Sequence, residues 1–255
     1  MALPPPSPSE PLEITALPVL QDNYVFVLQR ASQAVVVDPA VADPVIAWLE
    51  QRQLALVAVL QTHHHSDHIG GTPELLRRWP AAEVIASGAD RARIPFQTRP
   101  VAGGDRLALL GRTVEVLEVP GHTRAHLAFH LPAVGEEGAE LFCGDTLFAG
   151  GCGRLFEGTP QQMLASLRAL TALSPSTRIW CAHEYTEGNL RWAAAQRPSD
   201  AAIAQRLAEV QARRRRREAT IPSSVGLERA TNLFVRAGDA AELAALRQSK
   251  NTWQG

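Results

Sequence analysis

Cysteine and long apolar runs are scarce in this chain of 255 residues. Its three cysteines are an odd number without CxxC spacing, which argues against a disulfide framework and a thiolate zinc finger and predicts reduced core thiols. No apolar run is long enough to span a membrane. The proline-rich start, residues 1–13, lacks the basic end and apolar centre of a targeting peptide. We therefore expect a flexible N-terminal tail on a cytoplasmic protein.

The chain also has no marked excess of positive or negative charge, because it contains 25 basic and 26 acidic residues. A net charge of −1 creates no overall field that would attract nucleic acid or a membrane surface. The one basic run, residues 213–217, has no aromatic residues beside it and lies shortly before Pro222. This pattern predicts the solvated end of a helix. We expect neither nucleic acid nor membrane as a partner.

Alternating structural signals fill residues 14–184 and change after them. Short runs rich in Val, Ile and Phe predict strands, and helical patterns lie between several of them, which together favour an α/β sandwich. From residue 185 to 255 the signals are helical and rich in Ala and Leu. We predict a catalytic domain over 14–184 and a helical domain over 185–255. The expected strands are 24–29, 34–39, 56–62, 83–87, 113–120, 127–131, 140–145 and 178–183, and the expected helices are 44–53, 72–79, 160–170, 190–196, 199–219 and 239–248.

Four of the eight histidines lie in the stretch THHHSDHIGG, residues 62–71, between a predicted strand and a predicted helix. Residues two apart in extended backbone point the same way, so His63 and His65 can converge on one metal ion. Asp67 and His68, which follow in the same stretch, can bind at a second metal-binding point nearby. An expression tag would be terminal and uninterrupted, and the helical zinc signature HExxH is absent. This density of ligand types predicts a metal site rather than a structural cluster.

Three further polar residues follow apolar strands: His122 in PGHT, Asp145 in CGDT and His183 in CAHE. Each alone is more often structural than functional, but their shared position suggests one site. Five imidazoles and two carboxylates are too many for one tetrahedral ion. They suit two ions that share one carboxylate, a pair that can activate water and stabilise an oxyanion.

These motifs resemble those of the metallo-β-lactamase superfamily and, within it, of the glyoxalase II (hydroxyacylglutathione hydrolase) family. LQDNYVFVL, RIP, GDTLFAGGCGRLFEGT, HEYTEGN, TIPSS and RQSKNTW extend the resemblance from about residue 14 to 253. The resemblance implies an αββα sandwich with a C-terminal helical domain that completes the substrate site. It implies one metal at His63, His65 and His122, a second at Asp67, His68 and His183, and Asp145 as the bridge.

The implied reaction is hydrolysis of S-D-lactoylglutathione to D-lactate and glutathione, the second step of methylglyoxal detoxification. Two divalent ions would make hydroxide from water, with Asp67 and Asp145 as the catalytic carboxylates. Zn is the expected metal, and Fe or Mn also suit this ligand set. His64 and His126 are candidates to hold the ligand imidazoles, a buried structural role being the alternative. We expect a monomer.

The resemblance also implies residues that bind the glutathione thioester. Arg247 and Lys250, the only lysine, are three apart on a predicted helix and match the family's partners for the glycine carboxylate. Tyr185 matches a tyrosine that contacts the tripeptide, and Arg154 stands where many relatives have Lys. Phe156 replaces a frequent Tyr. Ala125 replaces a usual Gly.

Several alternatives remain open at the level of sequence. The same scaffold supports lactonases, β-lactamases and mononuclear iron dioxygenases that act on glutathione persulfide. A dioxygenase normally lacks part of the second metal site, a common β-lactamase has a Cys ligand, and an RNA-processing relative needs an extended basic surface. A non-catalytic metal-binding scaffold is the remaining class, although degenerate members lose ligands and this chain retains all seven.

Overall fold

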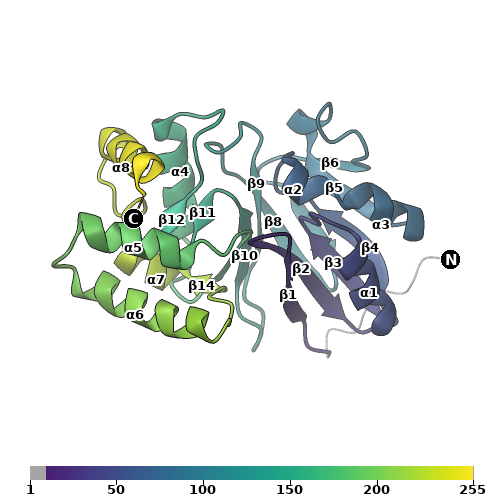
Figure 1. The fold of residues 1–255 in the computed structure, drawn as a ribbon. Coiled ribbons are helices and arrows are strands. Elements are labelled where there is room, and N and C mark those ends of the chain that lie inside the picture. Colours follow the sequence, from purple (N-terminus) through teal and green to yellow (C-terminus); the bar gives the residue numbers. More distant parts are fainter. Residues whose placement is uncertain (1–9, 255) are drawn as a thin grey trace. The chain divides into compact units, whose positions relative to one another are not determined.

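Six strands form one sheet in the first part of the computed structural model, which describes residues 10–254 (Figure 1). The strands pair in chain order, antiparallel from β1 to β3 and parallel from β3 to β6. Parallel neighbours need crossover connections, two of which carry helices here. The strands are β1 (Glu13–Val19), β2 (Asn23–Arg30), β3 (Gln33–Val37), β4 (Ala55–Leu60), β5 (Glu83–Ser87) and β6 (Arg99–Val101).

Helices α1 (Asp43–Gln51) and α3 (Thr72–Arg78) supply apolar side chains to the core of this sheet. Val45 and Leu49 of α1 and Leu75 of α3 are fully buried in one cluster with strand residues such as Val36 and Val59. β-branched side chains fit a pleated, buried surface, which explains why the runs 34–37 and 55–60 form strands. Between β4 and α3 lies the short helix α2 (Ser66–Ile69), and β5 leads into the 3-10 turn η1 (Gly88–Asp90).

Three more strands belong to this part of the chain: β7 (Arg106–Leu109), β8 (Arg112–Glu118) and β9 (Leu127–Leu131). They pair antiparallel in chain order. Buried Arg30 and Arg112 both pair with the carboxylate of Glu137. Burial raises the pKa of Glu137, but the backbone N–H of Leu12 and these two arginines together hold it below its usual value.

The chain divides into two units, the first comprising residues up to 118 and 127–137 and the second 119–126 and 138 onward. In the second unit β10 (Glu140–Gly144) pairs parallel with β13 (Arg178–Cys181), which pairs antiparallel with β14 (Ser223–Ser224). Between them run the hairpin β11 (Leu147–Phe148) and β12 (Gly151–Cys152) and helix α4 (Pro160–Thr171). Thr159 and Gln162 begin α4 with a reciprocal capping box.

Four helices follow in the second unit: α5 (Thr186–Gln196), α6 (Ala201–Arg215), α7 (Val225–Thr231) and α8 (Ala240–Thr252). The side chains of Asp200, Ser224 and Asp239 accept backbone N–H bonds at the start of the last three. The predicted helical character of this region is confirmed, with α7 as an addition that the sequence pattern did not indicate.

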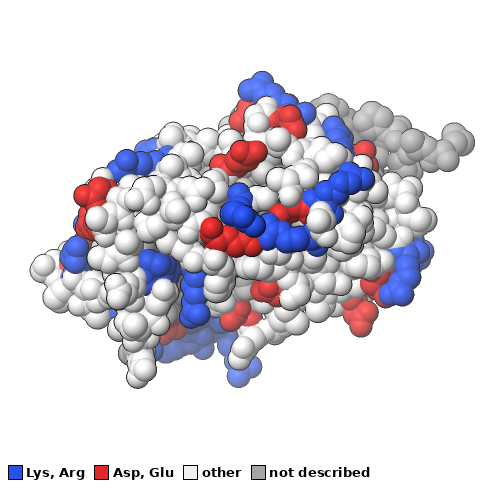
Figure 2. All heavy atoms as spheres, turned by 90° about the horizontal axis from the view of Figure 1, so that it is seen from above, with Lys and Arg blue, Asp and Glu red and all other residues white. Residues whose placement is uncertain are grey.

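The basic run at the end of α6 is a solvated helix end, as predicted. Arg213 and Arg214 donate to the carbonyl oxygens of Ala219 and Glu218, and Arg216 pairs with the Glu218 carboxylate. On the face shown in Figure 2, basic and acidic side chains are interspersed with uncharged ones. Over residues 10–254, none of the helices is long and apolar enough to cross a membrane. Of the predicted tail, residues 1–9 lie outside the described residues.

Candidate metal centre

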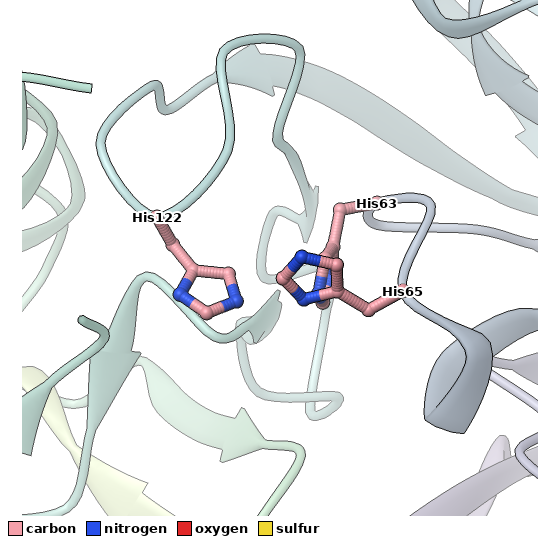
Figure 3. Close-up of side chains that lie close together, drawn as sticks. All are labelled: His63, His65 and His122. Atoms are coloured by element: carbon pink, nitrogen blue, oxygen red, sulfur yellow. The ribbon is translucent and has the colours of Figure 1, made fainter. Parts of the chain in front are cut away.

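His63 and His65 occupy the loop between β4 and α2, as Figure 3 shows. Nε2 of His63 lies 3.0 Å from Nδ1 of His65, and the two rings meet edge to face. Two nitrogens at 2.0–2.1 Å from one tetrahedral zinc ion would be about 3.3 Å apart. The structure therefore brings these two imidazoles together, at a separation close to what one shared ion requires.

Asp67 and His68 form a second pair one turn further on, in α2. Nε2 of His68 lies 3.7 Å from Oδ2 of Asp67, while Nδ1 of His68 lies 3.0 Å from Oδ2 of Asp38. A carboxylate on Nδ1 holds the proton there and leaves Nε2 as the metal-binding nitrogen. The second predicted pair is therefore also brought together.

Asp38 is a further member of this cluster that the sequence reasoning missed. Its carboxylate accepts from the backbone N and the hydroxyl of Thr62, at 2.8 and 2.6 Å, besides holding His68. Its backbone has a φ of 49°, a left-handed conformation that is uncommon outside glycine and often marks functional sites. The available signal was its position directly after the apolar strand β3, the same position that singled out Asp145.

His64 lies between the two ligand histidines but has other partners. Its Nδ1 is 3.2 Å from the buried carboxylate of Asp90, and its Nε2 is 3.2 Å from a guanidinium nitrogen of Arg93. Arg93 also donates to Asp90, which closes the triad. Both imidazole nitrogens are thus engaged. The ring of His64 also lies edge to face with that of His65, at 4.8 Å between centroids, and the RIP motif supplies Arg93.

Asp145 lies between two histidines in the second unit. Its Oδ2 is 3.5 Å from Nε2 of His122, and its Oδ1 is 3.3 Å from Nε2 of His183. The three side chains are buried, and each carboxylate oxygen faces a different imidazole. This is the arrangement expected of a carboxylate that bridges two ions.

The imidazole of His122, also drawn in Figure 3, is held by a backbone carbonyl. Its Nδ1 lies 2.9 Å from the carbonyl oxygen of Arg154, so this nitrogen donates and Nε2 carries the lone pair that faces Asp145. A Cβ on Gly153 would lie 2.0 Å from the carbonyl oxygen of Asp145, which explains the glycine in GCGR. His126 holds Asp145 in turn, because its Nε2 accepts a hydrogen bond from the backbone N–H of Asp145 at 3.2 Å.

The three cysteines do not take part in this chemistry. Cys143, Cys152 and Cys181 are free and buried, as predicted. Burial raises the pKa of Cys152 to about 11 and that of Cys181 to about 12, and raises the pKa of Cys143 well above its usual value. A thiol with a raised pKa keeps its proton at neutral pH, which disfavours all three cysteines as thiolate ligands.

A pocket of about 470 Å³ lies in the second unit beside His122. Arg154 and Arg247 line it, and so does Phe156, whose ring centroid is 5.2 Å from that of His122. Arg154 therefore lines the pocket, and its carbonyl oxygen holds the imidazole of a predicted metal ligand. The remaining lining residues are Leu155, Pro160, Ala244, Gln248 and Asn251.

Arg247 is a buried cation in the wall of this pocket. It donates from Nη1 to the carbonyl oxygen of Cys152 at 2.7 Å and from Nε to Oδ1 of Asn251 at 3.0 Å. Its guanidinium lies 5.1 Å from the centroid of the Phe234 ring. These contacts fix the guanidinium, and a fixed guanidinium group is well suited to bind an anion.

The other two predicted substrate-binding residues lie outside the wall of this pocket. Lys250 donates to the carbonyl oxygen of Gly188 at 2.9 Å and lies 4.7 Å from the ring centroid of Trp253. Burial, with the nearby Arg247 as a smaller cause, lowers the pKa of Lys250 to about 8. Tyr185 is partly exposed and stacks on the imidazole of His183 at 4.8 Å.

The donor set fits two divalent cations. The first unit holds two pairs of candidate ligands and the second holds a carboxylate between two imidazoles, and the contacts of His68 and His122 fix their tautomers. Nitrogen and carboxylate donors suit Zn, Fe and Mn alike. A pair of such ions would polarise a carbonyl group and lower the pKa of water.

Two family models cover nearly the whole chain. The model described as the metallo-beta-lactamase superfamily matches residues 18–183, and the model described as the hydroxyacylglutathione hydrolase C-terminus matches residues 184–253. The chain is 61% identical to the hydroxyacylglutathione hydrolase of Synechococcus sp. (strain CC9605) over 243 residues, which are 94% of this chain and 97% of the relative.

Solved structures share the fold. A crystal structure of ETHE1 from Myxococcus xanthus matches with a TM-score of 0.71 and 22% identity, covering 95% of this chain and 92% of the other. TTHA1623 in a di-iron-bound form matches with a TM-score of 0.60 and 27% identity, covering 87% of this chain and 99% of the other. The predicted metallo-β-lactamase fold with a C-terminal helical region is confirmed.

Proposed function

Because the chain belongs to the hydroxyacylglutathione hydrolase family of the metallo-β-lactamase superfamily, we propose that it hydrolyses S-D-lactoylglutathione and related 2-hydroxyacyl thioesters of glutathione. The products are the 2-hydroxy acid and glutathione. The observation that carries the proposal is the double role of Arg154, which joins a pocket with two arginines to a histidine of the ligand set. A substrate anchored in that pocket lies beside His122.

The seven ligands divide between two ions in this proposal. His63 and His65 bind one ion together with His122. Asp67 and His68 bind the other together with His183. Asp145 bridges them, which accords with its two oxygens facing different imidazoles. The expected metal is Zn, with Fe or Mn as alternatives.

The reaction exchanges a C–S bond for a C–O bond. Two bound ions would supply a nucleophile from water and stabilise the charge on the thioester carbonyl oxygen. The chain's own contribution is orientation: Asp38 and the Arg154 carbonyl hold His68 and His122 in single tautomers. The glutathione thiolate is a good leaving group, so no general acid is required.

Recognition of glutathione falls to the second unit. Glutathione has two carboxylates, and fixed guanidinium groups bind carboxylates well. We assign Arg247 and Arg154 to the pocket wall and Lys250 and Tyr185 to its surroundings, with the helical region 185–255 as the substrate-binding part and 14–184 as the catalytic part. A monomer in the cytoplasm remains our expectation.

Replacing Arg247 with alanine tests this assignment. Losing a charged hydrogen bond of about 1.5–3 kcal/mol predicts a KM for S-D-lactoylglutathione raised roughly 10- to 100-fold, with kcat nearly unchanged. Loss of the thioester absorbance gives both constants. Arg99→Ala, which removes an arginine with an exposed ion-pair partner, is the matched control. A variant with unchanged KM would remove Arg247 from the binding site.

Lys250 predicts a pH dependence of KM. Its pKa is lowered to about 8, so its charge is lost as the pH rises through 8 rather than near 10.5. If it binds a substrate carboxylate, KM should rise roughly tenfold from pH 7 to above pH 9. Lys250→Arg keeps its charge over this range and should give a flat profile. A flat wild-type profile would contradict the role of Lys250.

A further inference from the structure

The motif LQDNYV forms the hairpin between β1 and β2, and no function has yet been assigned to it. Residues 20–22 make the turn, with Leu20 at a φ of 52°. Asn23 begins β2 and pairs with Val19 across the hairpin. Its side chain is almost completely buried, with 6% of its surface exposed. A buried amide needs hydrogen-bond partners, and these partners point to its role.

The partners of Asn23 both belong to one residue, Asp67. Nδ2 of Asn23 donates to the backbone oxygen of Asp67 at 3.2 Å and to its Oδ2 at 3.1 Å. Nδ2 has two hydrogens, one for each bond. One amide group therefore fixes the main chain and the carboxylate of Asp67 together, across 44 positions of sequence.

We propose that Asn23 is a positioning residue that orients the carboxylate of Asp67 for the ion bound by Asp67 and His68, an inference that rests on the metal assignment above. A neutral donor suits this task, because it orients a carboxylate without competing as a ligand or cancelling its charge. An aspartate of the same shape would place a second negative charge 3.1 Å away and offer no donor at neutral pH.

The contact is specific for one of the two ion sites. Asp67 is paired with His68, whereas His63 and His65 meet each other and His63 has Thr62 on its Nδ1. Loss of Asn23 should therefore weaken the binding of one ion per chain and spare the other. A residue that only stabilises the fold would affect both ions alike.

The test compares wild type, Asn23→Asp and Gln97→Ala. Gln97 is a matched control, since it is a buried amide of the same unit that donates to the carbonyl oxygen of Ser87 at 3.2 Å. Zinc is removed, restored to a slight excess, and titrated against a chelator of known affinity. Outer-shell partners typically change metal affinity 10- to 100-fold. We expect Asn23→Asp to lose one zinc ion at 10- to 100-fold lower chelator concentration, while Gln97→Ala matches wild type.

The melting temperature of the metal-free proteins separates positioning from folding. Asn23→Asp should melt close to the metal-free Gln97→Ala protein and gain less than wild type when zinc is added. If Asn23→Asp does not fold, Asn23→Ser, which is smaller and uncharged, replaces it in the same titration. A variant that releases both ions as wild type does would overturn the proposal. Failure of wild type to cleave the thioester while it retains two ions would instead reject the hydrolase function and leave Asn23 in place.

Discussion

Replacing Asp145 with alanine should lower kcat/KM for S-D-lactoylglutathione by more than about 100-fold, beyond the usual effect of losing an outer-shell partner. The carboxylate has one oxygen 3.5 Å from His122 and the other 3.3 Å from His183, so we expect its removal to affect both proposed ion sites at once. We also expect the purified variant to hold at most one zinc ion per chain. Initial rates and metal analysis of the same preparation measure both effects.

Two further variants make the Asp145 result specific. Asp145→Asn keeps the shape but removes the negative charge, and it should lose activity nearly as severely. Asp105→Asn is the control, because Asp105 is exposed and accepts a hydrogen bond in a surface turn. An Asp145→Ala enzyme with two ions and a tenth of the wild-type activity would show that this carboxylate is not the bridge.

Replacing Glu228 with glutamine should lower the free energy of unfolding by about 3–5 kcal/mol, because it leaves a buried guanidinium without its counter-charge. Glu228 is fully buried and pairs with Arg206, which is also buried. Its other oxygen accepts from the backbone N–H of Gly150 at 2.8 Å and from Nδ2 of Asn232 at 2.9 Å. The same carboxylate thus connects α6 and α7 to the β11–β12 hairpin.

Urea denaturation followed by circular dichroism measures this effect. Glu218→Gln is the control, because Glu218 pairs with Arg216 at an exposed helix end, where an ion pair contributes little. We expect its unfolding midpoint to equal that of wild type. A midpoint for Glu228→Gln no lower than that of Glu218→Gln would mean that the buried pair does not stabilise the second unit.

Every strand expected from an apolar run is present, whereas β1, β7 and the four shortest strands were not among those expected. Runs such as 34–39 and 127–131 are rich in residues that fit a buried sheet, and they form β3 and β9. β6, β11, β12 and β14 have only two or three residues each, which is too short for a periodic pattern. Helix α7 was also missed, although α3, which has the same length of seven residues, was expected.

The candidate ligands could be picked out because they follow strands or crowd into one loop, and of their supports only His126 was named beforehand. Asp38 and Asn23 act through residues 30 and 44 positions away, and only the folded chain brings them together. The carbonyl oxygen of Arg154 has no signal in its side chain at all. The matches to the family models place the sequence in its family, while the individual roles of Arg247 and Lys250 remain predictions for the experiments above.

Reconstitution of the metal-free protein with zinc tests the central claim most directly. Zinc would be added in measured equivalents per chain, and hydrolysis of S-D-lactoylglutathione followed by the loss of its thioester absorbance. We expect no turnover without metal and a rate that stops rising at about two equivalents, as a binuclear site requires. Full activity in the metal-free protein, or no turnover by a protein that has bound two ions, would contradict the account.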